Sequence, residues 1–177
     1  MTIENERARG EQGAVLVEFA LVFPILVMLL FGLLSGGMAW NQNLALSQGV
    51  RVGARYGATL PTTNYTSLDD YLDVLATRVV NNSDSNLATT VSGRMVCVAY
   101  VHPNGTDTLD KTRSRTETGT GTVSRNSSPC FTDSQSSSDT RVQAVAERTA
   151  TIETGFWSMS VTLHQQIVFR YEVTSAL

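Results

Sequence analysis

The amino-acid sequence predicts an α+β protein: a long N-terminal membrane-spanning helix that continues into a small soluble domain with one further helix and an antiparallel sheet. Three observations support this prediction. An apolar run of helical length lies near the N-terminus, a second segment has apolar residues at helical spacing, and three later segments have the composition of strands. A chain of 177 residues suits one membrane helix and one modest domain.

The apolar run covers residues 14–40 and contains one carboxylate, Glu18. No residue from Phe19 to Val50 is charged. The hydrocarbon core of a bilayer requires about 20 apolar residues in a helix, and a helix satisfies its own backbone hydrogen bonds in lipid. The run therefore predicts a transmembrane helix. A carboxylate inside such a helix is costly, so Glu18 needs a partner or a function.

Two other interpretations of the run remain open. It is a signal anchor if Glu18 lies at the level of the lipid headgroups. It is a cleavable secretory signal if an apolar core of about 7–15 residues precedes a small-x-small cleavage site. The run is longer than that, and residues 33–39 offer only weak small-residue spacing. The charges near the run do not set its orientation, because equal numbers of arginines flank it: Arg7 and Arg9 before it, Arg51 and Arg55 after it.

Glu18 is the fifth residue after Gly13, and a short polar leader precedes that glycine. This arrangement resembles the processing site of type IV prepilins. The segment that begins at Ala14, AVLVEFALVFPILVMLLFG, more closely resembles the TadE-like minor pilins, or pseudopilins, of the tight-adherence (Flp/Tad) pilus system. The resemblance implies a pilin-like lollipop that a prepilin peptidase cleaves between Gly13 and Ala14. Residues 1–13 are then a leader with no fold of its own.

Cleavage would place the new amino group of Ala14 about one helical turn from Glu18. In an assembled bundle, Glu18 of one subunit can then pair with this amine of its neighbour and set their axial register. The resemblance implies further partners: other pilins, the assembly platform and inner-membrane lipid. It places the N-terminus in the cytoplasm and residues 41–177 outside it, with possible incorporation in a surface pilus. The alternative function is a membrane-tethered periplasmic binding or adhesion domain that never enters a filament.

Within residues 41–177 the pattern predicts five regular segments. Residues 41–58 extend the first helix out of the membrane, although three glycines weaken this part. Residues 67–80 form a second helix with a capping box and a buried apolar stripe. Residues 89–101 form a strand, and two more strands at 141–153 and 160–173 are antiparallel neighbours.

Two cysteines, Cys97 and Cys130, lie in or near a polar segment at residues 103–139. In an oxidising compartment we expect them to form a disulfide, whereas in a reducing one they are two free thiols. The segment is rich in serine and threonine and is too long for an ordinary loop. We expect it to be either a displayed excursion that Cys130 ties back or a disordered segment.

Other function classes find little support. A net charge of −3 and a single lysine provide no basic patch for nucleic acid. Asp69, Asp70 and Asp73 lack the spacing of a calcium loop and suit the start of a helix instead. His102 and His164 belong to no catalytic or metal motif. We therefore expect a structural protein with no cofactor and no enzymatic activity.

Overall fold

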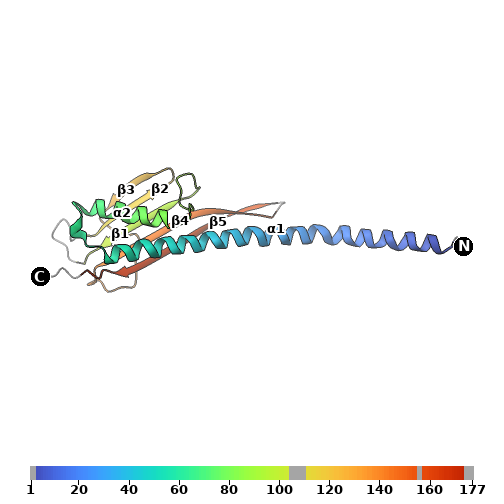
Figure 1. Ribbon diagram of the computed structural model, residues 1–177, viewed down its shortest axis with the longest axis horizontal. Coiled ribbons are helices and arrows are strands. Elements are labelled where there is room, and N and C mark those ends of the chain that lie inside the picture. The colour runs from blue at the N-terminus through green and yellow to red at the C-terminus, as the bar shows by residue number, and fades with distance from the viewer. Residues whose placement is uncertain (1–2, 104–110, 155–156, 174–177) are drawn as a thin grey trace. The chain divides into compact units, whose positions relative to one another are not determined.

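The computed structural model describes residues 3–103, 111–154 and 157–173, with side chains from residue 13 onward. It confirms the predicted α+β class: a long apolar helix, one further α-helix and a five-stranded antiparallel sheet (Figure 1). The elements are α1 (Ile3–Thr59), a 3₁₀ turn η1 (Thr62–Asn64), α2 (Leu68–Asn81), β1 (Met95–Val101), β2 (Arg113–Thr118), β3 (Thr122–Asn126), β4 (Arg141–Glu153) and β5 (Ser158–Arg170).

Two compact units divide the chain. One consists of residues 1–39 and 151–160, and the other of residues 40–150 and 161–177. The second unit contains the hydrophobic core and most of the sheet.

Helix α1 is longer at its N-terminal end than predicted. It begins at Ile3, so the part of the 1–13 leader that the structure describes is helical rather than without a fold of its own. Residues 1 and 2 lie outside the described residues. An existing helix gains one hydrogen bond for each residue added, and no proline lies between Ile3 and Gly13 to stop it. At its other end the helix runs to Thr59, close to the predicted position.

The sheet has the strand order β3-β2-β1-β4-β5. Strand β1 pairs antiparallel with both β2 and β4, and β2 with β3. Strand β1 starts at Met95, later than the predicted residue 89. The backbone turns just before it at Gly93, which has a φ of +60°, and a Cβ atom added there would lie 2.0 Å from Thr149 Oγ1. Strands β4 and β5 lie near their predicted bounds.

The segment at residues 103–139 corrects the prediction made for it. Its central part is neither disordered nor a displayed excursion, because β2 and β3 form a hairpin at the edge of the sheet. Residues 104–110 of the segment lie outside the described residues. Polar, serine- and threonine-rich strands give no apolar alternation, so their pairing depends on the backbone and on charged side chains instead.

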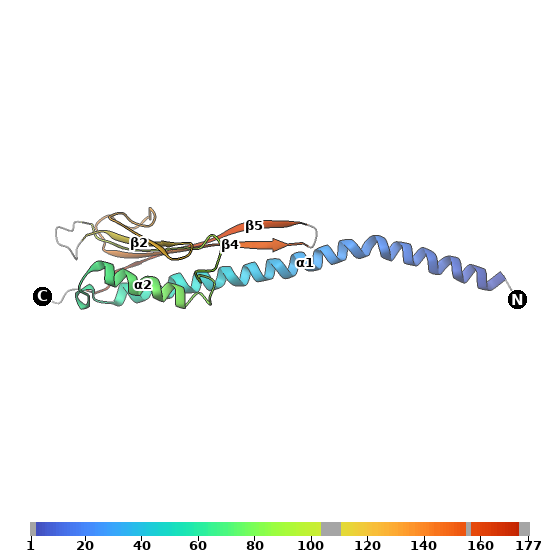
Figure 2. The same ribbon diagram turned by 90° about the horizontal axis from the view of Figure 1, so that it is seen from above.

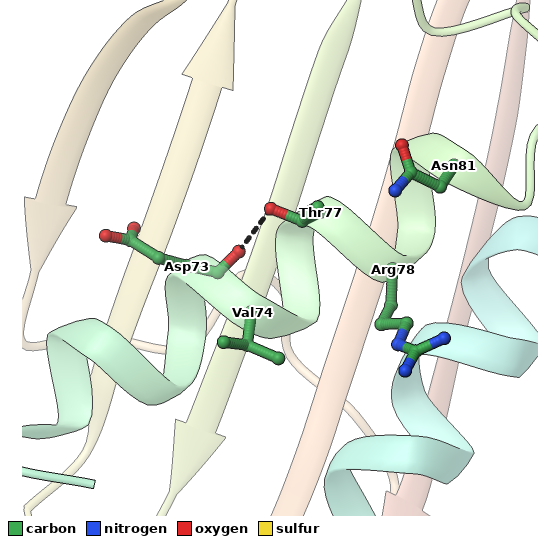
Figure 3. Close-up of a pocket in the computed structure, with 5 residues that line it drawn as sticks. All are labelled: Asp73, Val74, Thr77, Arg78 and Asn81. Carbon is green, nitrogen blue, oxygen red and sulfur yellow. Dashed lines mark hydrogen bonds between the residues drawn. The ribbon is translucent and has the colours of Figure 1, made fainter.

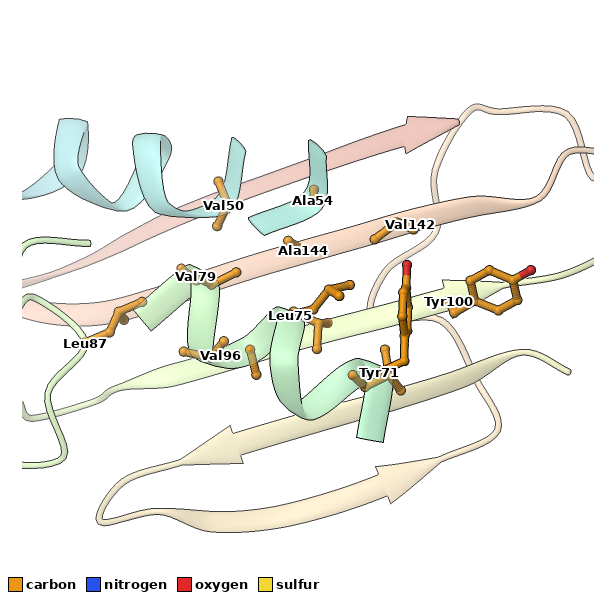
Figure 4. Close-up of a cluster of buried hydrophobic side chains, with 14 of the residues drawn as sticks. Val50, Ala54, Tyr71, Leu75, Val79, Leu87, Val96, Tyr100, Val142 and Ala144 are labelled. Atoms are coloured by element: carbon orange, nitrogen blue, oxygen red, sulfur yellow. The ribbon is translucent and has the colours of Figure 1, made fainter. Parts of the chain in front are cut away.

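One face of the sheet packs against α2 and the adjoining part of α1, as Figure 2 shows. The side chains that meet there are almost fully buried (Figure 4). Helix α1 supplies Leu46, Val50 and Ala54; α2 supplies Tyr71, Leu72, Leu75 and Val79; β1 and β4 supply Val96, Val98, Tyr100, Val142, Ala144 and Ala146. This core holds the second unit together by removing apolar surface from water.

Helix α2 starts as the sequence predicts. The backbone N–H of Asp70 donates to Ser67 Oγ at 3.2 Å, and Ser67 Oγ donates to Asp70 Oδ2 at 3.0 Å. Ser67 is therefore the expected N-cap, and Asp70 bonds to its hydroxyl rather than to its backbone N–H as in a capping box; such a cap contributes about 1 kcal/mol.

Three glycines of α1 bring that helix unusually close to α2. A Cβ atom added at Gly49 would lie 2.0 Å from Ser83 Oγ, and one at Gly53 would lie 2.3 Å from Val79 Cγ2. At Gly57 the nearest atom would be Leu75 Cδ2, at 2.5 Å. The glycines are spaced four residues apart and therefore share one face of the helix. These glycines allow α1 and α2 to pack closely. Their low helix propensity does not terminate α1.

The opposite face of β1 and β4 is covered by the chain that follows β3. Cys97 of β1 is bonded to Cys130, with their Cα atoms 5.9 Å apart. Gln143 of β4 is fully buried; it accepts a hydrogen bond from the Cys130 backbone N–H at 2.9 Å and donates to Phe131 O at 2.9 Å. A crosslink across a loop of this size stabilises a fold by about 3–4 kcal/mol in the chain-entropy model.

An ion-pair network joins α2 to the edge strands. Asp69 accepts two hydrogen bonds from Arg113, at 2.8 and 3.1 Å, and Asp73 pairs with both Arg115 and Arg125. The acidic residues of this helix, which the sequence analysis assigned only to its start, therefore also attach it to β2 and β3. None of the groups of acidic, histidine and cysteine side chains in the described residues is arranged to hold a metal ion.

Glu117 joins this network from inside the sheet. Its carboxylate contacts the buried Arg94 and also accepts from Arg115 at 2.8 Å. Burial raises the pKa of Glu117, but the hydrogen bonds from Arg94 and Arg115 outweigh burial and leave that pKa below its usual value. The Arg113 hydrogen bonds likewise lower the pKa of Asp69.

We expect the second unit to lose stability in acid. Because these carboxyl pKa values are lower in the folded state than in the unfolded chain, their contribution is complete above the ordinary carboxyl pKa of about 4. It is lost as the pH falls through the lower, folded-state values. Urea unfolding of the full chain in detergent should show a lower midpoint near pH 3 than near pH 7. The difference should shrink in Asp69→Asn, and equal midpoints at the two pH values would contradict the expectation.

Candidate functional site: the exposed apolar part of α1

The N-terminal half of α1 presents large apolar side chains all around its circumference. Most of these side chains from Val15 to Leu34 are about half exposed or more, and Leu33 reaches 75%, whereas Val27 and Met28 are partly buried. The exposed ones are Val15, Leu16, Val17, Phe19, Leu21, Val22, Phe23, Ile25, Leu26, Leu29, Leu30, Phe31, Leu33 and Leu34. A helix that exposes so many large apolar side chains needs an apolar environment.

This part of the helix meets the requirement for a membrane span. The helix from Gly13 to Thr59 contains an apolar window that is long enough to cross a bilayer, and none of that window is buried within the chain. Being unburied, it differs from the core helix of a soluble protein. A single membrane span near the N-terminus is therefore consistent with the structure.

Glu18 lies on the exposed surface of this helix, one turn after Ala14. None of the ion pairs between described side chains includes Glu18. The positions of Gly13, Ala14 and Glu18 along α1 are those that the sequence analysis assigned to processing and register. The geometry leaves the Glu18 carboxylate available to a group outside the chain.

A second exposed feature of the helix is a group of small residues. Added Cβ atoms at Gly32, Gly36 and Gly37 would meet nothing within 4 Å. Gly49, Gly53 and Gly57, by contrast, have α2 against them. Glycines at this spacing therefore lie against a neighbouring helix in the second unit. In the membrane segment, no other part of the described chain lies against them. Small residues with this spacing permit close approach of helices in membranes.

The first unit also contains one polar contact between distant parts of the chain. Ser35 is only 8% exposed, and its Oγ donates to the backbone carbonyl of Glu153 at 2.8 Å. Glu153 is the last residue of β4. The contact fixes the turn between β4 and β5 beside the end of the apolar run. The sequence analysis missed it, because a single serine after an apolar run carries no signal of a distant partner.

A shallow depression on α2 offers few free polar groups. Figure 3 shows a depression on α2 that is lined by Asp73, Val74, Thr77, Arg78 and Asn81. There Thr77 Oγ1 donates to the Asp73 carbonyl at 2.8 Å, and the Asp73 carboxylate is bound to arginines of the sheet. This depression therefore has few groups left for a ligand.

The two histidines are likewise engaged separately. His164 lies 2.5 Å from Glu147, and the His102 ring stacks on Tyr100 with centroids 6.3 Å apart. The structure gives each histidine its own partner and brings the two into no common cluster with an acidic side chain.

These features define the class of the protein. It is an α+β protein with one candidate membrane-spanning helix near its N-terminus and an antiparallel sheet that helices cover on one face. Residues 13–55 match the family model described as TadE-like protein. This match confirms the predicted resemblance: the chain is TadE-like over this segment, which links it to the Tad pilus system. No curated protein and no solved structure matches the chain.

Proposed function

We propose that this chain is a structural minor pilin or pseudopilin of a Flp/Tad-type pilus, with no enzymatic activity. The observation that carries the proposal is Glu18: a carboxylate exposed on an apolar helix, five residues after Gly13, inside the TadE-like segment. A prepilin peptidase cleaves after Gly13, and the mature chain starts at Ala14. The apolar stem stays in the inner membrane until it packs against the stems of other pilins.

The arrangement of the chain supports this role. The apolar half of α1 has no protein cover of its own and suits lipid before assembly and neighbouring helices afterwards. The disulfide between Cys97 and Cys130 suits an oxidising compartment and so favours export of residues 41–177 with the N-terminus in the cytoplasm. The pilus assembly platform is the further partner of this route, and surface attachment its outcome.

Cleavage after Gly13 can be tested by the intact mass of the protein purified from its native host. We expect a mass lower by that of residues 1–13, and we expect Gly13→Leu to retain these residues because a large side chain blocks the cleavage position. Gly10→Leu places the same side chain elsewhere in the leader and should leave processing unchanged.

Two results would contradict this proposal. A wild-type protein that retains Met1 would leave a membrane-tethered binding or adhesion domain, the alternative function. A protein that starts after residues 33–39 would instead identify the apolar run as a secretory signal.

A further inference from the structure

The turn between β4 and β5 carries two large apolar side chains that the described chain does not cover. Trp157 is 67% exposed and Met159 is 57% exposed. The turn is closed by Thr154, whose backbone N–H and Oγ1 both donate to the Trp157 carbonyl at 3.0 Å. We call the described residues 151–154 and 157–160 the hairpin tip. Trp157 and Met159 are therefore exposed beside this pair of hydrogen bonds, where water is a poor partner for their apolar atoms.

The hairpin tip lies beside a defined level of the apolar stem. Ser35 donates to the Glu153 carbonyl at 2.8 Å, and both residues belong to the same compact unit. Ser35 directly follows Leu34, which ends the run of large apolar residues that starts near Ala14. A helix from Ala14 to Leu34 rises about 30 Å, which is the thickness of the hydrocarbon core. The hairpin tip is therefore level with the boundary between hydrocarbon and headgroups, on the domain side of the span.

We propose that the hairpin tip is a membrane-interface anchor whose partner is the lipid bilayer around the stem. Tryptophan is the residue best suited to this depth, because its ring is apolar while its N–H keeps a polar partner among headgroups and water. Met159 adds apolar area that acyl chains can cover. This inference rests on the proposed membrane span, and it does not depend on cleavage or on entry into a pilus.

The chemistry of the hairpin tip also indicates which lipid property matters. Its described residues carry one carboxylate, Glu153, and no lysine or arginine. Threonine and serine supply the remaining polar groups. Basic residues are what attract a protein surface to anionic lipids. The anchor should therefore depend on the depth of the bilayer interface and be insensitive to the content of anionic lipid.

The chain contains two tryptophans, which makes the proposal testable by fluorescence. In Trp40→Phe, Trp157 is the sole reporter. The full-length variant is reconstituted in vesicles of phosphatidylethanolamine and phosphatidylglycerol, and its insertion is checked by flotation after an alkaline wash. Quenching is then measured with aqueous iodide and with lipids brominated near the headgroup end or near the methyl end of the acyl chain. A matched control moves the reporter to β3: Trp40→Phe, Trp157→Phe and Val123→Trp together.

We expect Trp157 to emit at a shorter wavelength in vesicles than the control. It should be quenched most by lipids brominated near the headgroups and be several-fold less sensitive to iodide than the control. Replacing phosphatidylglycerol by phosphatidylcholine should not change these values. Iodide quenching equal to that of the control, without quenching by brominated lipid, would overturn the proposal.

Three other outcomes would also overturn the proposal. Protection from iodide that grows with protein concentration and is absent with brominated lipid would assign the hairpin tip to a second copy of the chain. Failure to float with the vesicles would remove the span, and the anchor with it. Cleavage after Gly13 is measured separately by mass, so its failure is distinguishable from each of these results. Strong quenching from the methyl-end lipids alone would place Trp157 too deep for an interface.

The Ser35 contact provides a second test. In the Trp40→Phe background, Ser35→Ala removes the donor to Glu153 while the stem remains apolar. We expect quenching by headgroup-end bromines to fall and iodide quenching to rise, because the hairpin tip loses its attachment to the stem. Gly36→Ala is the matched control at the next position, where the added Cβ meets nothing within 4 Å. If Ser35→Ala leaves both quenching values unchanged, the contact does not position the tip.

Discussion

Glu18→Gln should prevent the chain from entering Tad-type filaments or their initiation complex, while its folding and membrane insertion stay unchanged. The variant keeps the size of the side chain and loses the charge. In the assembled bundle it leaves the Ala14 amine of the neighbouring subunit without a counter-ion. Removing one partner of a buried ion pair costs about 3–5 kcal/mol. A cost of this size lowers an association constant at least about a hundredfold.

The measurement is the ratio of the chain in sheared surface filaments to the chain in washed membranes, in the native host. The membrane amount controls for expression and folding, because Glu18 is not one of the residues that form the hydrophobic core of the described chain. Glu18→Asp keeps the charge on a shorter side chain and should restore part of the incorporation. Incorporation of Glu18→Gln at the wild-type level would contradict the register role, even if cleavage after Gly13 is confirmed.

Gly49→Ala should destabilise the second unit by about 1–3 kcal/mol, although alanine is the better helix former. The added methyl group would lie 2.0 Å from Ser83 Oγ and 2.8 Å from the Val79 carbonyl oxygen. The second of these atoms belongs to the backbone of α2, so it cannot move aside as a side chain can. Ser83 is fully buried, and its hydrogen bond to Val79 O at 2.6 Å would be disturbed as well. These costs exceed the gain of about 1 kcal/mol in helix propensity.

Urea unfolding of the full chain in detergent, followed by near-ultraviolet circular dichroism, measures this loss as a lower midpoint. Gly36→Ala is the matched control in the same helix, where nothing lies within 4 Å of the added Cβ, so the midpoint should stay the same. Gly49→Ala combined with Ser83→Ala should lose less than the sum of the two single changes, because the second removes one of the clashing atoms. A Gly49→Ala midpoint equal to or above that of the wild type would show that α1 and α2 are not held at this separation.

The sequence analysis predicted the helices well because their signals are local. Residues 14–40 are almost entirely apolar, and the apolar stripe of residues 67–80 recurs at helical spacing next to its own N-cap. The prediction failed for the segment at 103–139, where β2 and β3 have no apolar alternation. Their place in the sheet depends on Arg113, Arg115 and Arg125 meeting carboxylates of α2, and these partners are more than forty residues away in sequence.

The residues of the candidate site and the contacts around them also fall into two groups: those that a local pattern identifies and those that only the tertiary structure places. Gly13, Ala14 and Glu18 are recognisable because the proposed processing and register roles depend on spacing along one helix, and the TadE-like match covers this segment. Tertiary structure alone decided that Gly49, Gly53 and Gly57 face α2, that Gln143 supports the chain around Cys130, and that Ser35 binds the end of β4. The physical reason is that length and periodicity specify each element's own hydrogen bonds and apolar faces. Contacts between elements depend on distances in space that no local pattern contains.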